Sequence, residues 1–231
     1  MIKQGIVIQG PTTYYKEIIN KYKDLPNIVW STWEDEPIEN LNYISKYIPL
    51  VLNKKPNFSG YLNINLQNIT TLNGISYLIN QGVEEILKIR GDIIISNPNK
   101  LLSLLKGRKM SFLQMCKEGI RKDIYYELIY PHFSHDYPSD LIMYGESNIL
   151  YEGFNFTVEE ISPIPPESLI AYHILQKMNI EFKLNYDHLI KNQISFFMND
   201  CFKNKIDIIW INAKHNKNIT KTDIDKNIFD Y

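Results

Sequence analysis

A short charged island inside an apolar stretch holds the residue types in this sequence that could do chemistry. Lys88, Arg90 and Asp92 lie within residues 85–95, where isoleucine and leucine flank them on both sides. Burying such charges is costly unless they are paired or face a cleft. A carboxylate at a strand end, beside a glycine (Gly91) that lets a ligand approach the backbone, is typical of a nucleotide or metal–nucleotide site. A structural ion pair explains the same residues equally well.

A second group of candidate residues lies at positions 132–140, with the sequence HFSHDYPSD. His132, His135, Asp136 and Asp140 could supply a general base or a metal ligand. The spacing of the two histidines matches no zinc signature, because the further ligands of a closed site are missing. A surface loop rich in turn-forming residues is the alternative.

Two pairs of residues could make further ligand contacts. Asn65 and Gln67 stand at the start of an expected helix, where they could hydrogen-bond a ligand, although solvated amides on a helix face are the simpler interpretation. Trp30 and Trp33 flank the end of an expected strand. We expect one of the two in the core and the other to offer an aromatic face to a base or sugar.

Alternating strands and helices would position these groups. Apolar runs predict strands over residues 5–9, 27–31, 47–52 and 85–95, and helical spacing of apolar residues predicts helices over 14–22 and 65–78. This alternation indicates a parallel, doubly wound α/β sheet. Ligands bind such sheets beyond the carboxyl ends of the strands. The loops at 9–13, 32–37 and 91–92 are therefore the expected site.

The second half of the chain elaborates this sheet. Residues 98–105 and 166–178 are predicted helices, and 109–114 and 141–144 predicted strands, with a final strand or buried apolar segment at 206–211. No linker or internal repeat divides the chain, so we expect one domain.

Composition limits the classes of function. The 231 residues are 44% hydrophobic and 22% charged, with a formal net charge of −1. There is no basic excess, so we expect no nucleic-acid partner. No apolar run approaches the ~20 residues of a membrane span, and no secretory signal core precedes the first strand, so we expect a soluble cytoplasmic protein. Cys116 and Cys201 match no metal-ligand spacing and are expected to be thiols.

Several enzyme signatures are missing from the sequence. There is no G-x-G-x-x-G, which disfavours a dinucleotide oxidoreductase, and no P-loop. There is also no G-x-S-x-G, the nucleophile motif of serine hydrolases.

Five short motifs, taken in order, resemble the WavE family. Proteins of that family are associated with lipopolysaccharide synthesis and are similar to glycosyltransferases of GT-A type. The motifs are residues 6–11 (IVIQGP), residues 31–34 (STWE), Asn65 and Gln67 leading into Thr71 and Gly74, residues 88–92 (KIRGD), and Ser139 with Asp140. Pro166 and Glu167 extend the match into a late helix.

The resemblance implies a nucleotide-sugar-dependent glycosyltransferase of surface polysaccharide or glycan synthesis. Its fold would be a GT-A-like (Rossmann-type), mostly parallel sheet flanked by helices, with an elaborated C-terminal half. Residues 1–96 would form the nucleotide-binding half and residues 97–231 the acceptor-side half. The partners would be a nucleotide-sugar donor and a glycan or lipid-linked acceptor, the latter reached by docking at a membrane surface.

The resemblance also implies roles for particular residues. Asp140 would deprotonate the acceptor hydroxyl, with Asp136 as second choice. Asp92 would hold the diphosphate through Mn²⁺ or Mg²⁺, although Arg90 stands where the usual D-x-D motif has its first acid. The donor-binding residues would be Gln9, Gly10, Glu34, Asn65, Gln67, Lys88, Arg90 and Asp92.

Two other functions stay open at this point. The missing acid is what a non-catalytic nucleotide- or glycan-binding module of the same fold would show. A sugar-phosphate nucleotidyltransferase is the other alternative, disfavoured because no glycine-rich, lysine-bearing loop follows the first strand. The residues do not determine the donor, the acceptor, the stereochemical outcome or the oligomeric state.

Overall fold

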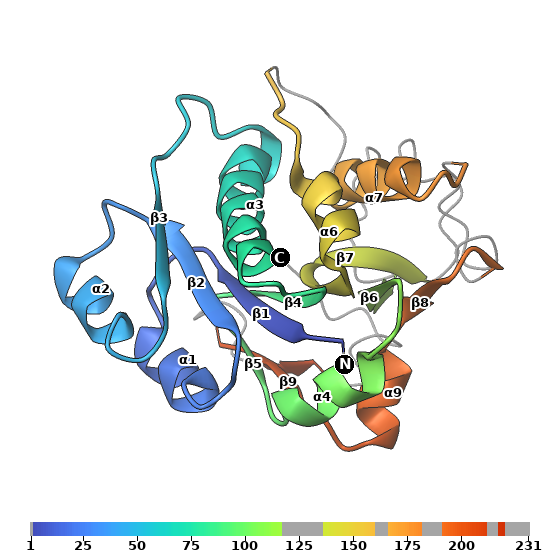
Figure 1. The fold of residues 1–231 in the computed structure, drawn as a ribbon, viewed down its shortest axis with the longest axis horizontal. Helices are drawn as coiled ribbons and strands as arrows, with labels where there is room; N and C mark the ends of the chain where they lie inside the picture. The colour runs from blue at the N-terminus through green and yellow to red at the C-terminus, as the bar shows by residue number, and fades with distance from the viewer. Residues whose placement is uncertain (1, 117–135, 160–165, 182–190, 212–216, 220–231) are drawn as a thin grey trace.

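A seven-stranded sheet in the order β3-β2-β1-β4-β7-β6-β8 organises the protein (Figure 1). The computed structural model describes residues 2–116, 136–159, 166–181, 191–211 and 217–219. The strands are β1 (Gln4–Gln9), β2 (Ile28–Trp33), β3 (Leu50–Asn53), β4 (Glu85–Arg90), β6 (Met110–Cys116), β7 (Asp136–Glu146) and β8 (Ile194–Phe196). Of these seven, β7 alone runs antiparallel to its neighbours.

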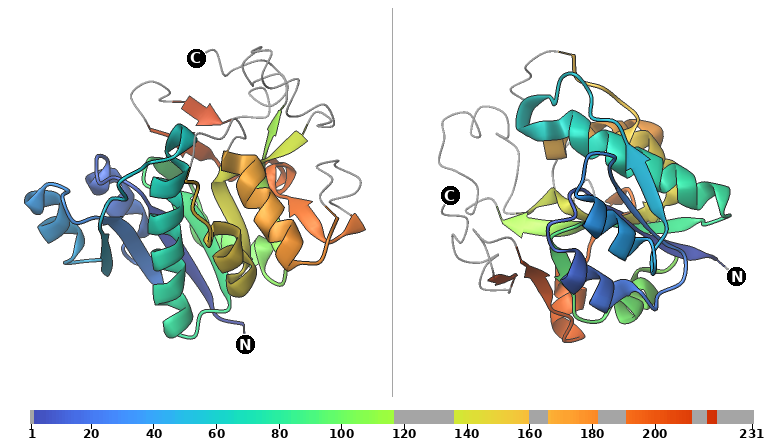
Figure 2. Two further views of the ribbon diagram at one scale, coloured as in Figure 1. Left: turned by 90° about the horizontal axis from the view of Figure 1, so that it is seen from above. Right: turned by 90° about the vertical axis from the view of Figure 1, so that its left-hand side faces the viewer.

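Helices cover both faces of this sheet (Figures 1 and 2). One face carries α1 (Tyr15–Tyr22), α2 (Ile38–Ile44), α4 (Pro98–Leu105) and α9 (Met198–Lys203), and the other carries α3 (Ile64–Asn80), α6 (Ser147–Phe154) and α7 (Pro166–Lys177). Successive side chains of a strand point to opposite faces. Accordingly Ile6 and Ile8 of β1 pack in the first core, while Val7 between them packs in the second. The predicted fold class, a mostly parallel sheet flanked by helices, is confirmed.

The prediction of one strand over residues 85–95 is wrong. The chain turns at Gly91 and Asp92, and β5 (Ile93–Ile95) joins a second, antiparallel sheet of order β10-β9-β5. Its other strands are β9 (Ile208–Trp210) and β10 (Lys217–Ile219). Ile93 pairs with Trp210 in this sheet. The second apolar run thus pairs with the C-terminal segment, while its Ile93 and Ile95 pack in the same core as Ile6 and Ile8 of the central sheet.

Three further boundaries differ from expectation. Helix α2 lies directly after the predicted loop at 32–37, in a stretch with no predicted element, because its buried face consists of only Leu41 and Ile44 and gives a weak periodic signal. Strand β3 begins at Leu50 rather than near residue 47. A short 3-10 turn, η1 (Tyr61–Asn63), leads into α3. None of the helices in the described part of the chain has both the length and the apolar character to cross a membrane.

Candidate functional site

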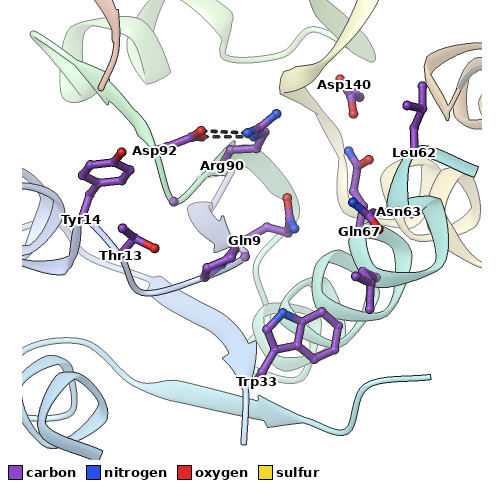
Figure 3. Close-up of a pocket in the computed structure, with 14 residues that line it drawn as sticks. Gln9, Thr13, Tyr14, Trp33, Leu62, Asn63, Gln67, Arg90, Asp92 and Asp140 are labelled. Carbon is purple, nitrogen blue, oxygen red and sulfur yellow. Dashed lines mark hydrogen bonds and ion pairs between the residues drawn. The ribbon is translucent and has the colours of Figure 1, made fainter. Parts of the chain in front are cut away.

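A cavity of about 330 Å³ opens at the carboxyl ends of β1, β2 and β4 (Figure 3). This is the sheet edge at which ligands of α/β proteins bind. The cavity is lined by Gln9, Gly10, Pro11, Thr13, Tyr14, Trp33, Leu62, Asn63, Leu66, Gln67, Arg90, Gly91, Asp92 and Asp140. Residues from both halves of the chain therefore meet in one place.

Four of these side chains lie on successive strands of the sheet. Trp33 ends β2, Gln9 ends β1, Arg90 ends β4, and Asp140 lies in β7, in the strand order β2-β1-β4-β7. Because β7 is antiparallel and its Ile142 pairs with Ile89, Asp140 falls just beyond Arg90. Neighbouring strands are about 4.8 Å apart, so the row from indole to carboxylate spans roughly 14 Å.

The loop after β1 is fixed by close backbone contacts. Gly91 donates its N–H to the carbonyl of Gln9 at 2.8 Å, and the indole of Trp30 donates to the carbonyl of Gly10 at 3.1 Å. A Cβ on Gly91 would lie 2.9 Å from the carbonyl oxygen of Pro11. Gly91 was expected to let a ligand approach the backbone. Its missing side chain instead makes room for the loop after β1, and that loop lines the cavity.

The Arg90–Asp92 pair projects over the cavity from the turn after β4 (Figure 3). Arg90 donates to the Asp92 carboxylate twice, from Nε at 3.1 Å and from Nη2 at 2.7 Å. The indole Nε1 of Trp210 donates to the same carboxylate at 2.7 Å. The Arg90 guanidinium also lies 5.4 Å from the centre of the Trp210 ring. Arg90 and Asp92, the two residues predicted to bind the diphosphate, therefore both line the cavity, and they form an ion pair with each other.

These contacts test whether Asp92 could hold the expected Mn²⁺ or Mg²⁺. Both of its oxygens accept hydrogen bonds from Arg90, and one accepts a third from Trp210. A divalent cation there would sit against a guanidinium of like charge. Asp140 is the other carboxylate on the cavity wall, and the described residues contain no cluster of three acidic, histidine or cysteine side chains suited to a metal. The donor set at Asp92 does not fit the metal role expected of it.

Lys88 lies beneath the cavity instead of lining it. Its side chain is completely buried, and Nζ donates to the main-chain carbonyl of Asp140. The ammonium group also lies 5.6 Å from the ring centre of Phe154. Burial lowers the pKa of Lys88 to about 8, although the charge of Asp140 opposes that shift. Lys88, predicted to contact a donor, is thus placed outside the cavity lining, where it supports the strand that carries Asp140.

Glu167, in the first turn of α7, is a half-buried carboxyl residue that interacts electrostatically with Asp140, Lys88 and Arg90. Burial, followed by the charge of Asp140, raises the pKa of Glu167 to about 8. Its Oε2 is buried and has no hydrogen-bond partner among the described residues. The Glu167 and Asp140 carboxyl groups are therefore close enough to influence each other electrostatically.

Two glutamines present unsatisfied atoms at the cavity. Oε1 of Gln9 and Nε2 of Gln67 are buried, and neither finds a hydrogen-bond partner within the described ranges. Both residues line the cavity. Because leaving buried polar atoms unpaired is costly, a polar ligand that donates to Gln9 and accepts from Gln67 would satisfy both.

Two predicted donor-binding residues lie elsewhere. Glu34 is exposed and does not line the cavity. Nearby Glu36 instead accepts from the backbone N–H of Thr12 at 3.0 Å and steadies the β1 loop. The amide of Asn65 is committed to backbone groups of Phe58 and Val158. The donor-binding assignments of Glu34 and Asn65 are therefore not supported by their positions.

The remaining predicted residues divide between the core, the cavity and undescribed positions. Trp30 is fully buried, and Trp33 is only 4% exposed although it lines the cavity, so its contact with a base or sugar stays a prediction. The backbone of Asp136 begins β7. Its side chain, and His132 and His135, lie outside the part of the chain that is described.

Sequence reasoning missed Trp210 and the part of the cavity wall formed by Tyr14, Leu62, Asn63 and Leu66. Trp210 belongs to an apolar run, IDIIWI, that resembles any buried strand. Its partner Asp92 is 118 positions away. The pattern of apolar residues around Asp207 indicates a strand, but it does not indicate that the Trp210 indole contacts Asp92.

No family model and no curated protein matches this chain. Among solved structures, it is similar to a cytidylyltransferase from Leptospira borgpetersenii, with 14% identity over 96% of this chain and 84% of that one, at a TM-score of 0.46. It is similar to galactosyltransferase LgtC, solved with donor and acceptor sugar analogs, with 7% identity over 84% and 72%, at 0.45. A putative glucose-1-phosphate thymidylyltransferase from Bacillus anthracis shares 11% identity over 85% and 86%, at 0.42. Likenesses this distant establish neither a family nor an activity for this chain.

Proposed function

We propose that this protein is a nucleotide-sugar-dependent glycosyltransferase, which moves a sugar from a nucleoside diphosphate to a hydroxyl of a glycan or lipid-linked acceptor. The observation that carries this proposal is the row of Trp33, Gln9, Arg90 and Asp140 along one cavity. An aromatic face, an amide, a guanidinium and a carboxylate follow one another in the order of base, ribose, diphosphate and sugar in such a donor.

The donor-side roles follow from chemistry. The Trp33 ring stacks on the base, as aromatic side chains do on nucleobases in general. Gln9 and Gln67 satisfy their buried amide atoms with polar groups of the donor. Arg90 binds diphosphate oxygens, for which a planar guanidinium is well suited. Gly10 and Pro11 present backbone rather than side chain to the donor.

Asp140 is the proposed general base. It accepts the proton of the acceptor hydroxyl as that oxygen bonds to the anomeric carbon. The bond between the anomeric carbon and the diphosphate oxygen breaks, and the electron pair leaves with the nucleoside diphosphate. Arg90 stabilises the negative charge that grows on this leaving group. Asp136 remains the second choice as base.

The pairing of Asp92 with Arg90 favours one alternative, a binding module without transfer chemistry, because it leaves no D-x-D acid free. The nucleotidyltransferase alternative would release pyrophosphate from a nucleoside triphosphate and a sugar phosphate. Product analysis separates these three functions.

The test incubates the protein with a panel of nucleotide sugars and follows release of nucleoside diphosphate and transfer of the sugar. We expect release with at least one donor. The Asp140→Asn variant should keep donor affinity and lose at least about a hundredfold in turnover, within the range typical for a general base. Asp200→Asn, which removes a carboxylate paired with Arg108 away from the cavity, serves as control. Donor binding without turnover would show a binding module, and pyrophosphate release would show a nucleotidyltransferase.

A further inference from the structure

The Asp92 carboxylate is held from two elements that are far apart in sequence. Arg90 grips it with two hydrogen bonds from β4, and Trp210 donates a third from β9. The backbone of the same residue is fixed as well, since Ile211 donates its N–H to the carbonyl of Asp92 at 2.9 Å. This is more restraint than a surface ion pair receives.

Exposure shows which partner faces a ligand. The side chain of Arg90 is 33% exposed, whereas that of Asp92 is 11% exposed. A guanidinium carries five N–H donors, and Asp92 occupies two of them. The other three N–H groups of Arg90 do not bind Asp92, and Arg90 lines the cavity. Arg90 therefore retains the donors that a diphosphate needs.

We propose that Asp92 and Trp210 are positioning residues that orient the Arg90 guanidinium, and that Arg90 so oriented binds a diphosphate without a divalent cation. This inference rests on the proposed function for the identity of the diphosphate as part of a donor. It assigns Asp92 a role different from the metal ligand expected from the sequence.

The second sheet explains how Trp210 comes to this place. β5 begins one residue after Asp92 and pairs with β9, with Ile93 opposite Trp210. This register sets the indole beside the Asp92 carboxylate and its face toward the guanidinium, 5.4 Å from the ring centre. Stacking on an aromatic face and a bidentate pair both restrict a guanidinium that would otherwise sample many rotamers. A pre-oriented group loses less entropy on binding.

The test is calorimetric titration with inorganic pyrophosphate, in EDTA and again with excess Mn²⁺. We expect binding in EDTA, with an affinity that Mn²⁺ changes by less than about threefold. Arg90→Lys keeps the positive charge but loses the planar set of N–H donors that can bind a phosphate through two hydrogen bonds, so pyrophosphate binding should weaken at least about tenfold. Trp210→Phe keeps the ring but removes the hydrogen bond to Asp92, and binding should weaken about threefold to tenfold, as for loss of one hydrogen bond.

Arg108→Lys is the matched control, because Arg108 pairs with Asp200 at 2.8 Å and does not line the cavity. It should bind pyrophosphate as the unaltered protein does. Binding that requires Mn²⁺, an absence of binding, or full affinity in Arg90→Lys would each overturn the diphosphate assignment. Full affinity in Trp210→Phe would overturn the positioning role. Urea unfolding of each variant confirms that it is folded before titration.

The outcomes separate this inference from the proposed function. Pyrophosphate binding in EDTA without any sugar transfer would leave the inference standing and sink the glycosyltransferase. Sugar transfer that depends on Mn²⁺ would support the glycosyltransferase and overturn the metal-free role of Arg90.

Discussion

The buried ammonium group of Lys88 donates a hydrogen bond to the main-chain carbonyl of Asp140, 52 positions later in the chain. This contact joins the charged island at residues 88–92 to β7, the strand that carries the proposed base. Lys88 is fully buried, so the contact lies under the cavity and cannot be replaced by water without opening the core. It makes the position of Asp140 depend on a residue that never meets the ligand.

Replacing Lys88 with methionine should reduce turnover while leaving donor affinity nearly unchanged. The apolar side chain fills the space but cannot hold the carbonyl of Asp140, so we expect a fall of about tenfold or more in kcat with little change in KM. Steady-state kinetics on an active donor measure the split. Lys100→Met is the control, since Lys100 makes the same type of contact, to the carbonyl of Asn204 at 2.9 Å, on an exposed surface. A rise in KM with kcat intact would instead place Lys88 at the donor.

Stability should fall between about pH 4.5 and 8 because of Glu167. Its pKa is raised from 4.5 to about 8 in the folded protein, mainly by burial. The folded state therefore keeps a proton that the unfolded chain releases, and stability is lost as pH rises through this window, with a slope approaching about 1.4 kcal/mol per pH unit. Urea unfolding across this range should show a flatter profile for Glu167→Gln. An unchanged slope in that variant would mean that Glu167 is ionised when folded.

Lys88 should act in the opposite direction at higher pH. Its pKa is lowered from 10.5 to about 8, again chiefly by burial. Between these values the unfolded chain holds a proton that the folded protein has released, so stability should rise with pH from about 8 to 10.5. Lys88→Met should remove this rise in urea unfolding while preserving the fall at lower pH. Loss of both limbs in one variant would show that the two groups titrate as a unit.

Gly91→Ala should displace the β1 loop and abolish ligand binding. The added methyl group would lie 2.9 Å from the carbonyl oxygen of Pro11 and 3.3 Å from the Trp30 ring, neither of which is a flexible chain end. We expect a loss of about 1–3 kcal/mol in the free energy of unfolding, typical of overpacking. In the Gly153→Ala control the added methyl group would clash with the side chain of Ile174, which does not line the cavity. It should cost stability and spare pyrophosphate binding, whereas equal binding losses in both would refute a local effect.

Asn65→Ala should lower stability without touching the cavity directly. The Asn65 amide donates to Phe58 and Val158 carbonyls at 3.1 and 2.7 Å and accepts from the Val158 N–H at 2.8 Å. Removing a buried amide that satisfies three backbone groups should cost about 2–3 kcal/mol, measured by urea unfolding. Pyrophosphate affinity should stay within about twofold when measured well below the unfolding midpoint. A large affinity loss with normal stability would return Asn65 to the list of binding residues.

Local pattern was enough to predict the sheet and the edge at which its cavity opens. The run at residues 5–9, the helix that begins near Asn65 and the apolar stretch around Lys88 each carry their own periodicity, and alternation of such units implies a parallel sheet. The carboxyl-edge rule then placed Gln9, Arg90 and Asp92 at one site, and the cavity does contain all three. Short elements with few buried residues, such as α2, lacked that signal.

The apolar runs around Lys88, Arg90 and Asp92 have to be buried, so the amino-acid order alone requires these three charges to lie in or beside the core. The groups that each charge contacts follow from the packing of distant elements. Lys88 meets the strand of Asp140, and Asp92 meets Trp210 from the opposite end of the chain. Pairing across 118 positions depends on the register of β9 against β5, and a strand's register depends on partners that its own residues do not specify.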